Sequence, residues 1–78
     1  MSVRFYLYFP AERDAREAAD ELRSSGYDVR CEEDHPERQW LVLVSTEASP
    51  TQLHELEPRF EALADRLNGD YDGHEFDL

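Results

Sequence analysis

The stretch QWLVLVST, residues 39–46, decides the fold of this chain. Its residues 40–44 are all apolar, so a strand formed here needs cover on both of its faces. This composition predicts a central strand of a sheet. One face of the strand carries Trp40, Val42 and Val44, and the other carries Leu41 and Leu43.

The sequence before this stretch predicts a strand, a helix and a second strand. In VRFYLYFP, residues 3–10, apolar residues alternate with other types, which is the period of a strand, and Pro10 ends it. In AERDAREAADELRSSG, residues 11–26, alanines recur at helical spacing and acidic residues gather in the first half. The small alanine stripe lets this helix approach a sheet closely. YDVRCEE, residues 27–33, alternates again and predicts the second strand.

The sequence after the central strand predicts a second helix in ASPTQLHELEPRFEALADRLNG, residues 48–69. Ser49 and Gln52 match a capping box, and Pro50 between them suits the first helical position. Pro58 lies within the helical pattern and is expected to kink the helix or to split it after its second turn. The buried stripe of this helix is predicted to consist of Leu53, Leu56, Phe60, Leu63 and Leu67.

Two short segments complete the order of the elements. DHPER, residues 34–38, predicts a polar turn, and DYDGHEFDL, residues 70–78, is long enough for one more strand in which Gly73 permits a β-bulge or a close backbone approach. The order strand, helix, strand, strand, helix, strand folds through short right-handed connections into a four-stranded antiparallel sheet with both helices on one face. We therefore expect a single domain over residues 1–78, of the α+β class with a ferredoxin-like βαββαβ arrangement.

NGDYDGHE, residues 68–75, invites comparison with a calcium-binding loop. Asn68, Asp70 and Asp72 take the first, third and fifth ligand positions of an EF-hand. No helix is predicted to follow, and the eighth position is Glu75 instead of the usual apolar residue, so we interpret the stretch as a helix end followed by a strand. The three histidines show no metal-binding spacing, and no metal is expected.

Charge is the strongest feature of the composition. The chain has 19 acidic residues against eight arginines, no lysine, and a net charge of −11. Such a surface repels nucleic acid backbones and anionic membranes, and it attracts basic partners. The alternative is that the charge only keeps the protein in solution or adapts it to high salt.

No constellation of residues predicts catalysis. Carboxylates are too numerous for one pair to be singled out, no glycine-rich phosphate loop is present, and no Ser-His-Asp set can be identified. Cys31 is followed by three acidic residues, which disfavour a reactive thiolate. We expect a protein that is not an enzyme and has no cofactor. The single cysteine and the lack of a signal peptide predict a cytoplasmic location.

The sheet face away from the helices is predicted to carry an apolar and aromatic patch. Tyr6 and Tyr8 point outward if their neighbours face the helices, and the central strand sends either Trp40 or the pair Leu41 and Leu43 to the same side. Such patches usually mark interaction surfaces, unless loops or the C-terminal residues cover them. An RNA-recognition motif also has aromatic residues there, but its glycine and basic signature is missing. We expect a protein partner or a homodimer, with no direct contact to nucleic acid or membrane.

Four segments carry a resemblance to a known family: YFP (8–10), EAADELRSSGYDV (17–29), WLVLVS (40–45) and ELEPRFEALADRLNGDYDGHE (55–75). With them the chain resembles the RraB family of regulators of ribonuclease E activity, from Phe5 to about Glu75. The most specific part is the ending Gly-x-Tyr-Asp-Gly-x-Glu at residues 69–75, in which family members usually have Trp where this chain has His74. The predicted partner-binding residues are Tyr6, Tyr8, Trp40, Tyr71, Asp72, Gly73, His74 and Glu75.

The resemblance implies a non-catalytic domain that binds a ribonuclease E-type endoribonuclease and damps RNA turnover. The physical hypothesis is that acidic residues dock onto basic, RNA-binding segments of the nuclease, while the aromatic patch adds specificity. A competing hypothesis is a small-molecule-sensing module that acts as a dimer, since domains of this fold can bind ligands between subunits. Ligand sensing predicts a defined pocket with convergent polar groups, whereas a protein-binding domain predicts a broad patch.

Overall fold

The computed structural model describes residues 1–34 and 39–77. The predicted polar turn therefore lies outside the described residues, except for Asp34, which ends a strand. The strands and helices follow one another in the predicted order. They are β1 (Ser2–Phe9), α1 (Glu12–Ser24), β2 (Asp28–Asp34), β3 (Gln39–Glu47), α2 (Pro50–Arg66) and β4 (Asp70–Asp77).

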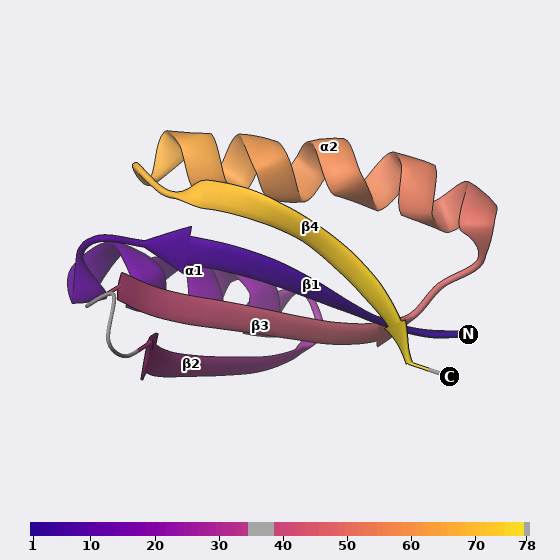
Figure 1. Cartoon of the computed structure of the whole chain (residues 1–78), viewed down its shortest axis with the longest axis horizontal. Coiled ribbons are helices and arrows are strands. Elements are labelled where there is room, and N and C mark those ends of the chain that lie inside the picture. Colours follow the sequence, from indigo (N-terminus) through magenta and orange to yellow (C-terminus); the bar gives the residue numbers. More distant parts are fainter. Residues whose placement is uncertain (35–38, 78) are drawn as a thin grey trace.

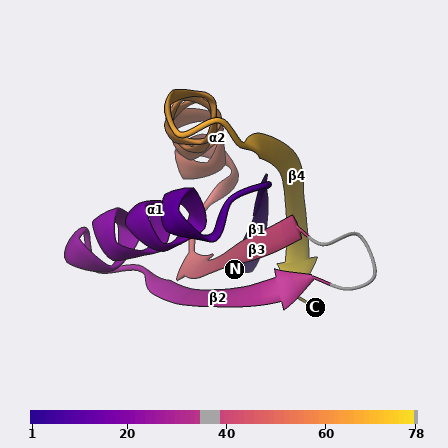
Figure 2. The same cartoon turned by 90° about the vertical axis from the view of Figure 1, so that its left-hand side faces the viewer.

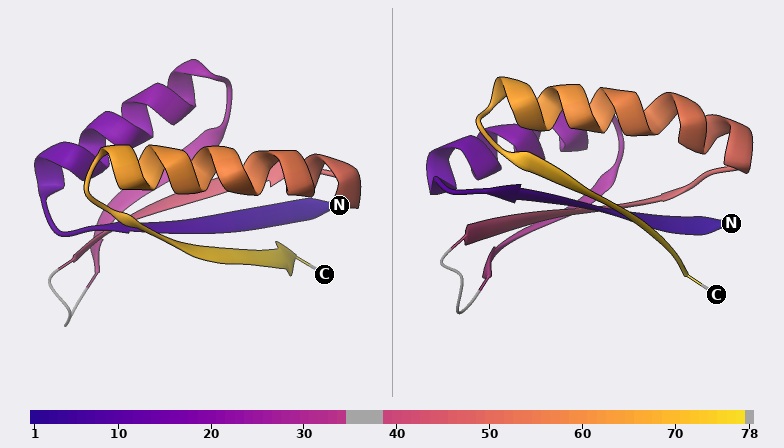
Figure 3. Two further views of the ribbon diagram at one scale, coloured as in Figure 1. Left: turned by 90° about the horizontal axis from the view of Figure 1, so that it is seen from above. Right: turned by 45° about the horizontal axis from the view of Figure 1, so that its top comes forward.

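The strands form one antiparallel sheet in the order β2-β3-β1-β4, and both helices lie on one face of it (Figure 1). Seen from its end, the sheet is strongly twisted and the helices lie in its concave side (Figure 2). The view from above shows α2 running along β1 and β4, with α1 beside it (Figure 3). β3 has a neighbour on each side, so its predicted central position is confirmed, and the fold is ferredoxin-like as predicted.

The hydrophobic core lies between the sheet and the helices. The four alternate apolar residues of β1 are fully buried, as their spacing predicts. Small alanines on α1 are fully buried as well, so the backbone of this helix comes close to the sheet. From α2, the Phe60 ring packs edge-on against Phe5 with 4.7 Å between ring centroids, and Tyr27 packs against the same Phe60 ring at 5.5 Å.

The ends of α2 are determined by local hydrogen bonds. Ser49 Oγ accepts from the backbone N–H of Gln52 at 3.2 Å, and the Gln52 side chain accepts from the backbone N–H of Ser49 at 2.8 Å, so the predicted capping box is confirmed. At the other end, Asn68 has a φ of 63°. The backbone N–H of Gly69 then donates to the carbonyl of Ala64 at 2.7 Å, which closes a Schellman motif and turns the chain into β4.

α2 continues through Pro58 as one helix, so the predicted split after its second turn is wrong. Proline removes the hydrogen bond that an N–H would donate to the carbonyl four residues earlier, which belongs to His54. Both Pro58 and His54 are exposed, so water can satisfy that carbonyl. Apolar residues before and after the proline pack against the core, and this packing outweighs the local break.

The register between β1 and β3 determines which side chains point away from the helices. Leu41 and Leu43 lie directly opposite Tyr8 and Tyr6, and opposed residues share a face of the sheet. Trp40 lies on the other face and packs against the core. Of the two alternatives that the sequence leaves open, the outer face therefore takes the leucine pair.

β4 contains the predicted bulge. The pairing of β4 with β1 shifts register at Tyr6, which faces both Asp72 and Gly73. Gly73 has a φ of 101°, a conformation that glycine adopts at little cost. Because of the extra residue, Tyr71 and His74 both point toward the helices, although strict alternation would place them on opposite faces.

Candidate protein-binding surface

The face of the sheet that the helices leave uncovered, which we call the open face, has an apolar centre. Tyr6, Tyr8, Leu41 and Leu43 lie side by side on β1 and β3, and each is half-buried. Polar residues of β2 and β4 border this centre. The side chains of the open face are Ser2, Arg4, Tyr6, Tyr8, Asp28, Arg30, Glu32, Asp34, Gln39, Leu41, Leu43, Ser45, Glu47, Asp70, Asp72 and Glu75.

Acidic side chains flank the apolar centre on both sides. Within residues 1–34 and 39–76, the open face holds seven carboxylates against two guanidinium groups, and one carboxylate, that of Glu47, pairs with the N-terminal ammonium, which leaves a net charge of −4. Both cations already have acidic neighbours, because Arg30 lies 3.6 Å from Glu32 and Arg4 lies 4.0 Å from Glu75. The open face therefore presents negative potential on each side of an apolar strip.

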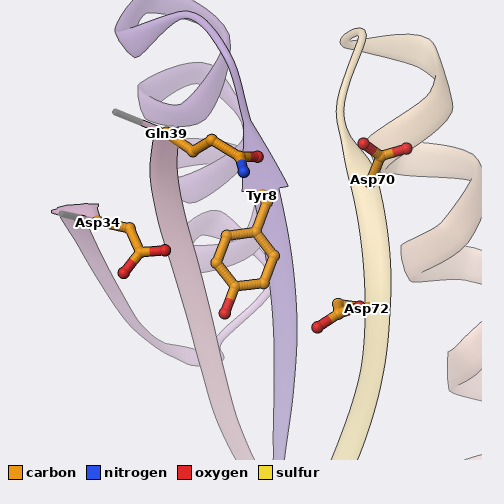
Figure 4. A pocket seen from close by; sticks show the side chains of 5 residues that line it. All are labelled: Tyr8, Asp34, Gln39, Asp70 and Asp72. Atoms are coloured by element: carbon orange, nitrogen blue, oxygen red, sulfur yellow. The ribbon is translucent and has the colours of Figure 1, made fainter. Parts of the chain in front are cut away.

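One end of the open face is hollowed around Tyr8. The hollow measures about 310 Å³, and the Tyr8 ring stands between Asp34 on one side and Asp70 and Asp72 on the other, with Gln39 at its rim (Figure 4). In the part of the chain that the structure describes, the three aspartates form no ion pair or hydrogen bond with another side chain. Burial raises the pKa of the Tyr8 hydroxyl, and the charges of Asp34 and Asp72 raise it further, so the phenol stays a neutral donor.

Two other residues of the predicted site are bonded to each other on the open face. The Tyr6 hydroxyl donates to Glu75 Oε2 at 2.9 Å, and this hydrogen bond raises the pKa of Tyr6. The bond links β1 to β4 next to the bulge.

Tyr71 and His74 were predicted as partner contacts but lie on the helix side of the sheet, against α2. The Tyr71 hydroxyl donates to Glu57 Oε2 at 2.6 Å, and His74 Nδ1 lies 3.0 Å from the same oxygen. The hydrogen bond from Tyr71 lowers the pKa of Glu57, and the one with His74 lowers it further. Burial and the bond to Glu57 raise the pKa of Tyr71. These contacts join β4 to α2 within the chain.

The predicted site is thus divided between the two faces. Tyr6, Tyr8, Asp72 and Glu75 share the open face, and Gly73 shapes the bulge beside them. The other three predicted residues, Trp40, Tyr71 and His74, lie on the helix side. There the His74 ring packs edge-on against Phe76, with 5.4 Å between the ring centroids. Four polar residues that were not among the predicted partner-binding residues complete the two groups: Asp34, Gln39, Glu57 and Asp70.

Cys31, Asp72 and His74 do not come together in the described structure. Cys31 lies on β2, at the sheet edge opposite to β4, and Asp72 and His74 lie on different faces of β4. Burial raises the pKa of the Cys31 thiol, which disfavours the thiolate. No group of three His, Cys, Asp or Glu residues within 1–34 and 39–77 is arranged to hold a metal ion. None of the helices in this part of the chain is long and apolar enough to cross a membrane.

Two further hollows lie on the helix side of the molecule. They measure about 340 Å³ and about 240 Å³, and Tyr27 and Arg59 line both of them. The larger one is bordered by Glu21, whose carboxylate pairs with Arg66 across the two helices. The larger hollow is at the low end of the range of volumes for small-molecule sites, about 300–1,000 Å³, and the smaller one lies below that range.

A family model described as "Regulator of ribonuclease activity B" matches residues 1–75 of the 78-residue chain. The chain belongs to the RraB family. The resemblance noted in the sequence is thereby confirmed, and the RraB family is one of regulators of ribonuclease activity. No curated protein and no solved structure matches the chain.

The RraB match includes residues 69–75, three of which have structural roles. Gly69 fits against Phe9, Tyr71 bonds to α2, and Gly73 forms the bulge. Asp72 has no such partner among the described residues and points into the hollow on the open face.

Proposed function

We propose that this protein regulates a ribonuclease E-type endoribonuclease by binding to it, as a non-catalytic acidic domain. The observation that carries the proposal is the match to a family of ribonuclease regulators over residues 1–75. The net charge of −11 supports binding to protein rather than to RNA, because the RNA backbone carries the same sign of charge.

The mechanism that we propose is competition with RNA. Segments that bind RNA are rich in arginine and lysine, and an acidic protein surface offers them carboxylates in place of phosphates. Occupied segments are no longer available to the substrate, so cleavage slows without any reaction at the regulator. The half-buried apolar strip on the open face adds contacts that depend on shape and not on charge alone.

The proposal is tested by titrating the protein into an RNA cleavage assay with a ribonuclease E-type enzyme. We expect inhibition that saturates at a fixed ratio of the two proteins, that added RNA reverses, and that weakens as salt rises. A pull-down from native lysate, washed at several salt concentrations, should recover the nuclease at low salt. Absence of binding and of inhibition would refute the proposed function, and affinity independent of salt would refute charge competition.

A second candidate function is small-molecule sensing by a dimer. The hollow of about 340 Å³ between the helices, with Arg59 at its wall, is the observation that favours it. This function predicts a metabolite that copurifies with the protein and a particle of twice the chain mass. Native mass spectrometry of protein purified without denaturation measures both. A monomer without bound metabolite would exclude this candidate.

A further inference from the structure

We propose that the open face of the sheet is the docking surface for an arginine-rich segment of the partner, and that the hollow at Tyr8 receives one of its guanidinium groups. The inference rests on the proposed function, which requires a bound basic segment but does not say where it binds. It assigns the surface, the type of residue that fits it and one position at which that residue is recognised.

The layout of the open face matches the two chemical parts of an arginine side chain. Each arginine has an aliphatic stem that packs on apolar surface and a cationic head that seeks carboxylates. The strip formed by Tyr6, Tyr8, Leu41 and Leu43 is half-buried and can take the stems. Acidic residues of β2 and β4 lie on both sides of the strip, within the reach of the heads.

The hollow at Tyr8 supplies the most specific position on this surface. Asp34, Asp70 and Asp72 line the hollow without an ion pair in the described chain, so their negative potential favours the entry of a cation. A guanidinium group is planar, stacks on an aromatic ring such as that of Tyr8, and donates two parallel hydrogen bonds to one carboxylate. An ammonium group lacks this planar fork, so lysine fits less well than arginine.

On the helix side of the molecule, arginines of the same chain pair with several carboxylates, and the carboxylates that have no ion pair with the described residues, such as Glu17 and Asp65, stand apart from any apolar strip like that of the open face. Arg16 pairs with Glu12 at 2.7 Å, and Arg23 pairs with Asp20 at 3.5 Å. A third pair links Glu21 on α1 to an arginine of α2. In the hollow, by contrast, the aspartates are free of such pairs within the described residues.

The net charge of the open face also disfavours a second copy of this chain as the molecule that binds there. Two open faces brought together would oppose a net charge of −4 with another of the same sign. Like charges placed opposite each other across an interface disfavour association. An arginine-rich segment instead neutralises the acidic borders and covers the apolar strip in one step.

The first test compares two triple variants that change the net charge equally, from −11 to −8. The open-face variant is Asp34→Asn, Asp70→Asn and Asp72→Asn. The matched control, Glu17→Gln, Glu61→Gln and Asp65→Asn, changes exposed helix residues that have no ion pair with the described residues. The probe is a fluorescein-labelled peptide of ten residues in which arginine and glycine alternate, with lysine in place of arginine as a second probe.

We expect wild-type protein to bind the arginine peptide more tightly than the lysine peptide at low salt. The open-face variant should lose about tenfold in affinity for the arginine peptide, and the control only about twofold. Circular dichroism verifies that both variants are folded. Equal losses in the two variants, or no binding of the arginine peptide by wild-type protein, would overturn the proposal.

The second test needs no variant. Backbone amide shifts of the wild-type protein are followed by NMR while the arginine peptide is added. We expect the largest changes around Tyr8 and its neighbours on β1, β3 and β4. Changes confined to α1 and α2 would place the peptide on the other side of the molecule and contradict the inference.

An RNA cleavage assay with both triple variants separates the docking surface from the proposed function. If wild-type protein and both variants inhibit the nuclease equally, the function stands and the assigned surface is wrong. If wild-type protein binds the arginine peptide on the open face but neither binds nor inhibits the nuclease, the surface stands and the proposed function is wrong.

Discussion

At the scale of single residues, Gly69 is packed where no side chain fits. A Cβ atom added here would lie 2.6 Å from the Tyr8 carbonyl oxygen and would overlap the ring of Phe9, which is fully buried. Gly69→Ala should therefore lower the free energy of unfolding by about 2 kcal/mol, because neither the backbone nor a core ring can move freely. Urea denaturation followed by circular dichroism measures this loss.

Gly73→Ala provides the comparison for this prediction. A Cβ atom at Gly73 meets nothing within 4 Å, so only its φ of 101° opposes substitution. The expected loss is about 1 kcal/mol, the strain of a left-handed conformation. A loss at Gly69 no larger than that at Gly73 would mean that the contact with Phe9 does not limit packing.

The Tyr71 hydroxyl provides a prediction with a defined pH dependence. The hydrogen bond from the Tyr71 hydroxyl lowers the pKa of Glu57 in the folded state. Ionised Glu57 therefore stabilises the fold at pH values above the unfolded-state pKa of Glu57, about 4.3. This contribution is lost as the pH falls through the lower pKa of the folded state. Tyr71→Phe should raise the pKa of Glu57 and lower the free energy of unfolding at pH 7 by about 1 kcal/mol. Tyr71→Phe should also reduce the part of the loss in unfolding free energy at low pH that comes from protonation of Glu57.

Carboxyl chemical shifts of Glu57 measured between pH 2 and 7 test the pKa, and urea denaturation over the same range tests the stability. Tyr6→Phe is the matched control, because it removes a tyrosine hydroxyl that is bonded to Glu75 instead. An unchanged pKa of Glu57 in Tyr71→Phe would show that the hydrogen bond contributes nothing in solution.

At the scale of elements, α2 contains a proline that does not interrupt the helix but removes one of its backbone hydrogen bonds. Pro58 is exposed in mid-helix and leaves the carbonyl of His54 without an intrahelical donor. Pro58→Ala restores that hydrogen bond and a residue of high helix propensity, at the cost of a more flexible unfolded chain. We expect a net gain of about 1 kcal/mol, measured by urea denaturation, with Glu61→Ala as an exposed control in the same helix. A net loss would show that Pro58 stabilises the native packing.

The order and the ends of the elements could be predicted because local signals determine them. The Ser49 capping box, the Asn68-Gly69 helix end and the alternation of β1 each need only a few neighbouring residues. That α2 continues unbroken through Pro58 could not be predicted, since long-range packing outweighs the local break. The outer residues of β3 could not be chosen either, because an apolar strand has no period that distinguishes its faces.

The candidate surface was predictable only in part, because the face on which a strand residue lies follows from alternation only where the strand is regular. Tyr6 and Tyr8 were placed correctly on the open face because β1 alternates. Tyr71 and His74 share a face only through the bulge, which displaces the alternation of β4 by one residue. Asp34 was assigned to the polar turn and not placed beside Tyr8, since acidic residues are common throughout this chain and only the sheet register brings the two together.

At the scale of the whole molecule, the net charge of −11 should give salt opposite effects on stability and on binding. The molecule extends over 32 × 24 × 18 Å, and the screening length falls from about 30 Å at 0.01 M salt to about 10 Å at 0.1 M. At the lower salt, like charges therefore repel one another across the whole molecule, whereas at the higher salt only neighbouring charges interact. Salt should thus raise the melting temperature, because repulsion is stronger in the compact state than in the unfolded chain.

The same screening should weaken the complex with the arginine peptide or with a nuclease, because the attraction between opposite charges is reduced. Thermal unfolding and peptide affinity, measured in the same buffers from 0.01 to 0.3 M NaCl, test both effects together. The triple control variant with a net charge of −8 should show a smaller gain in melting temperature. A melting temperature that fell as salt was added would show that specific ion pairs within the chain, rather than its net charge, dominate stability.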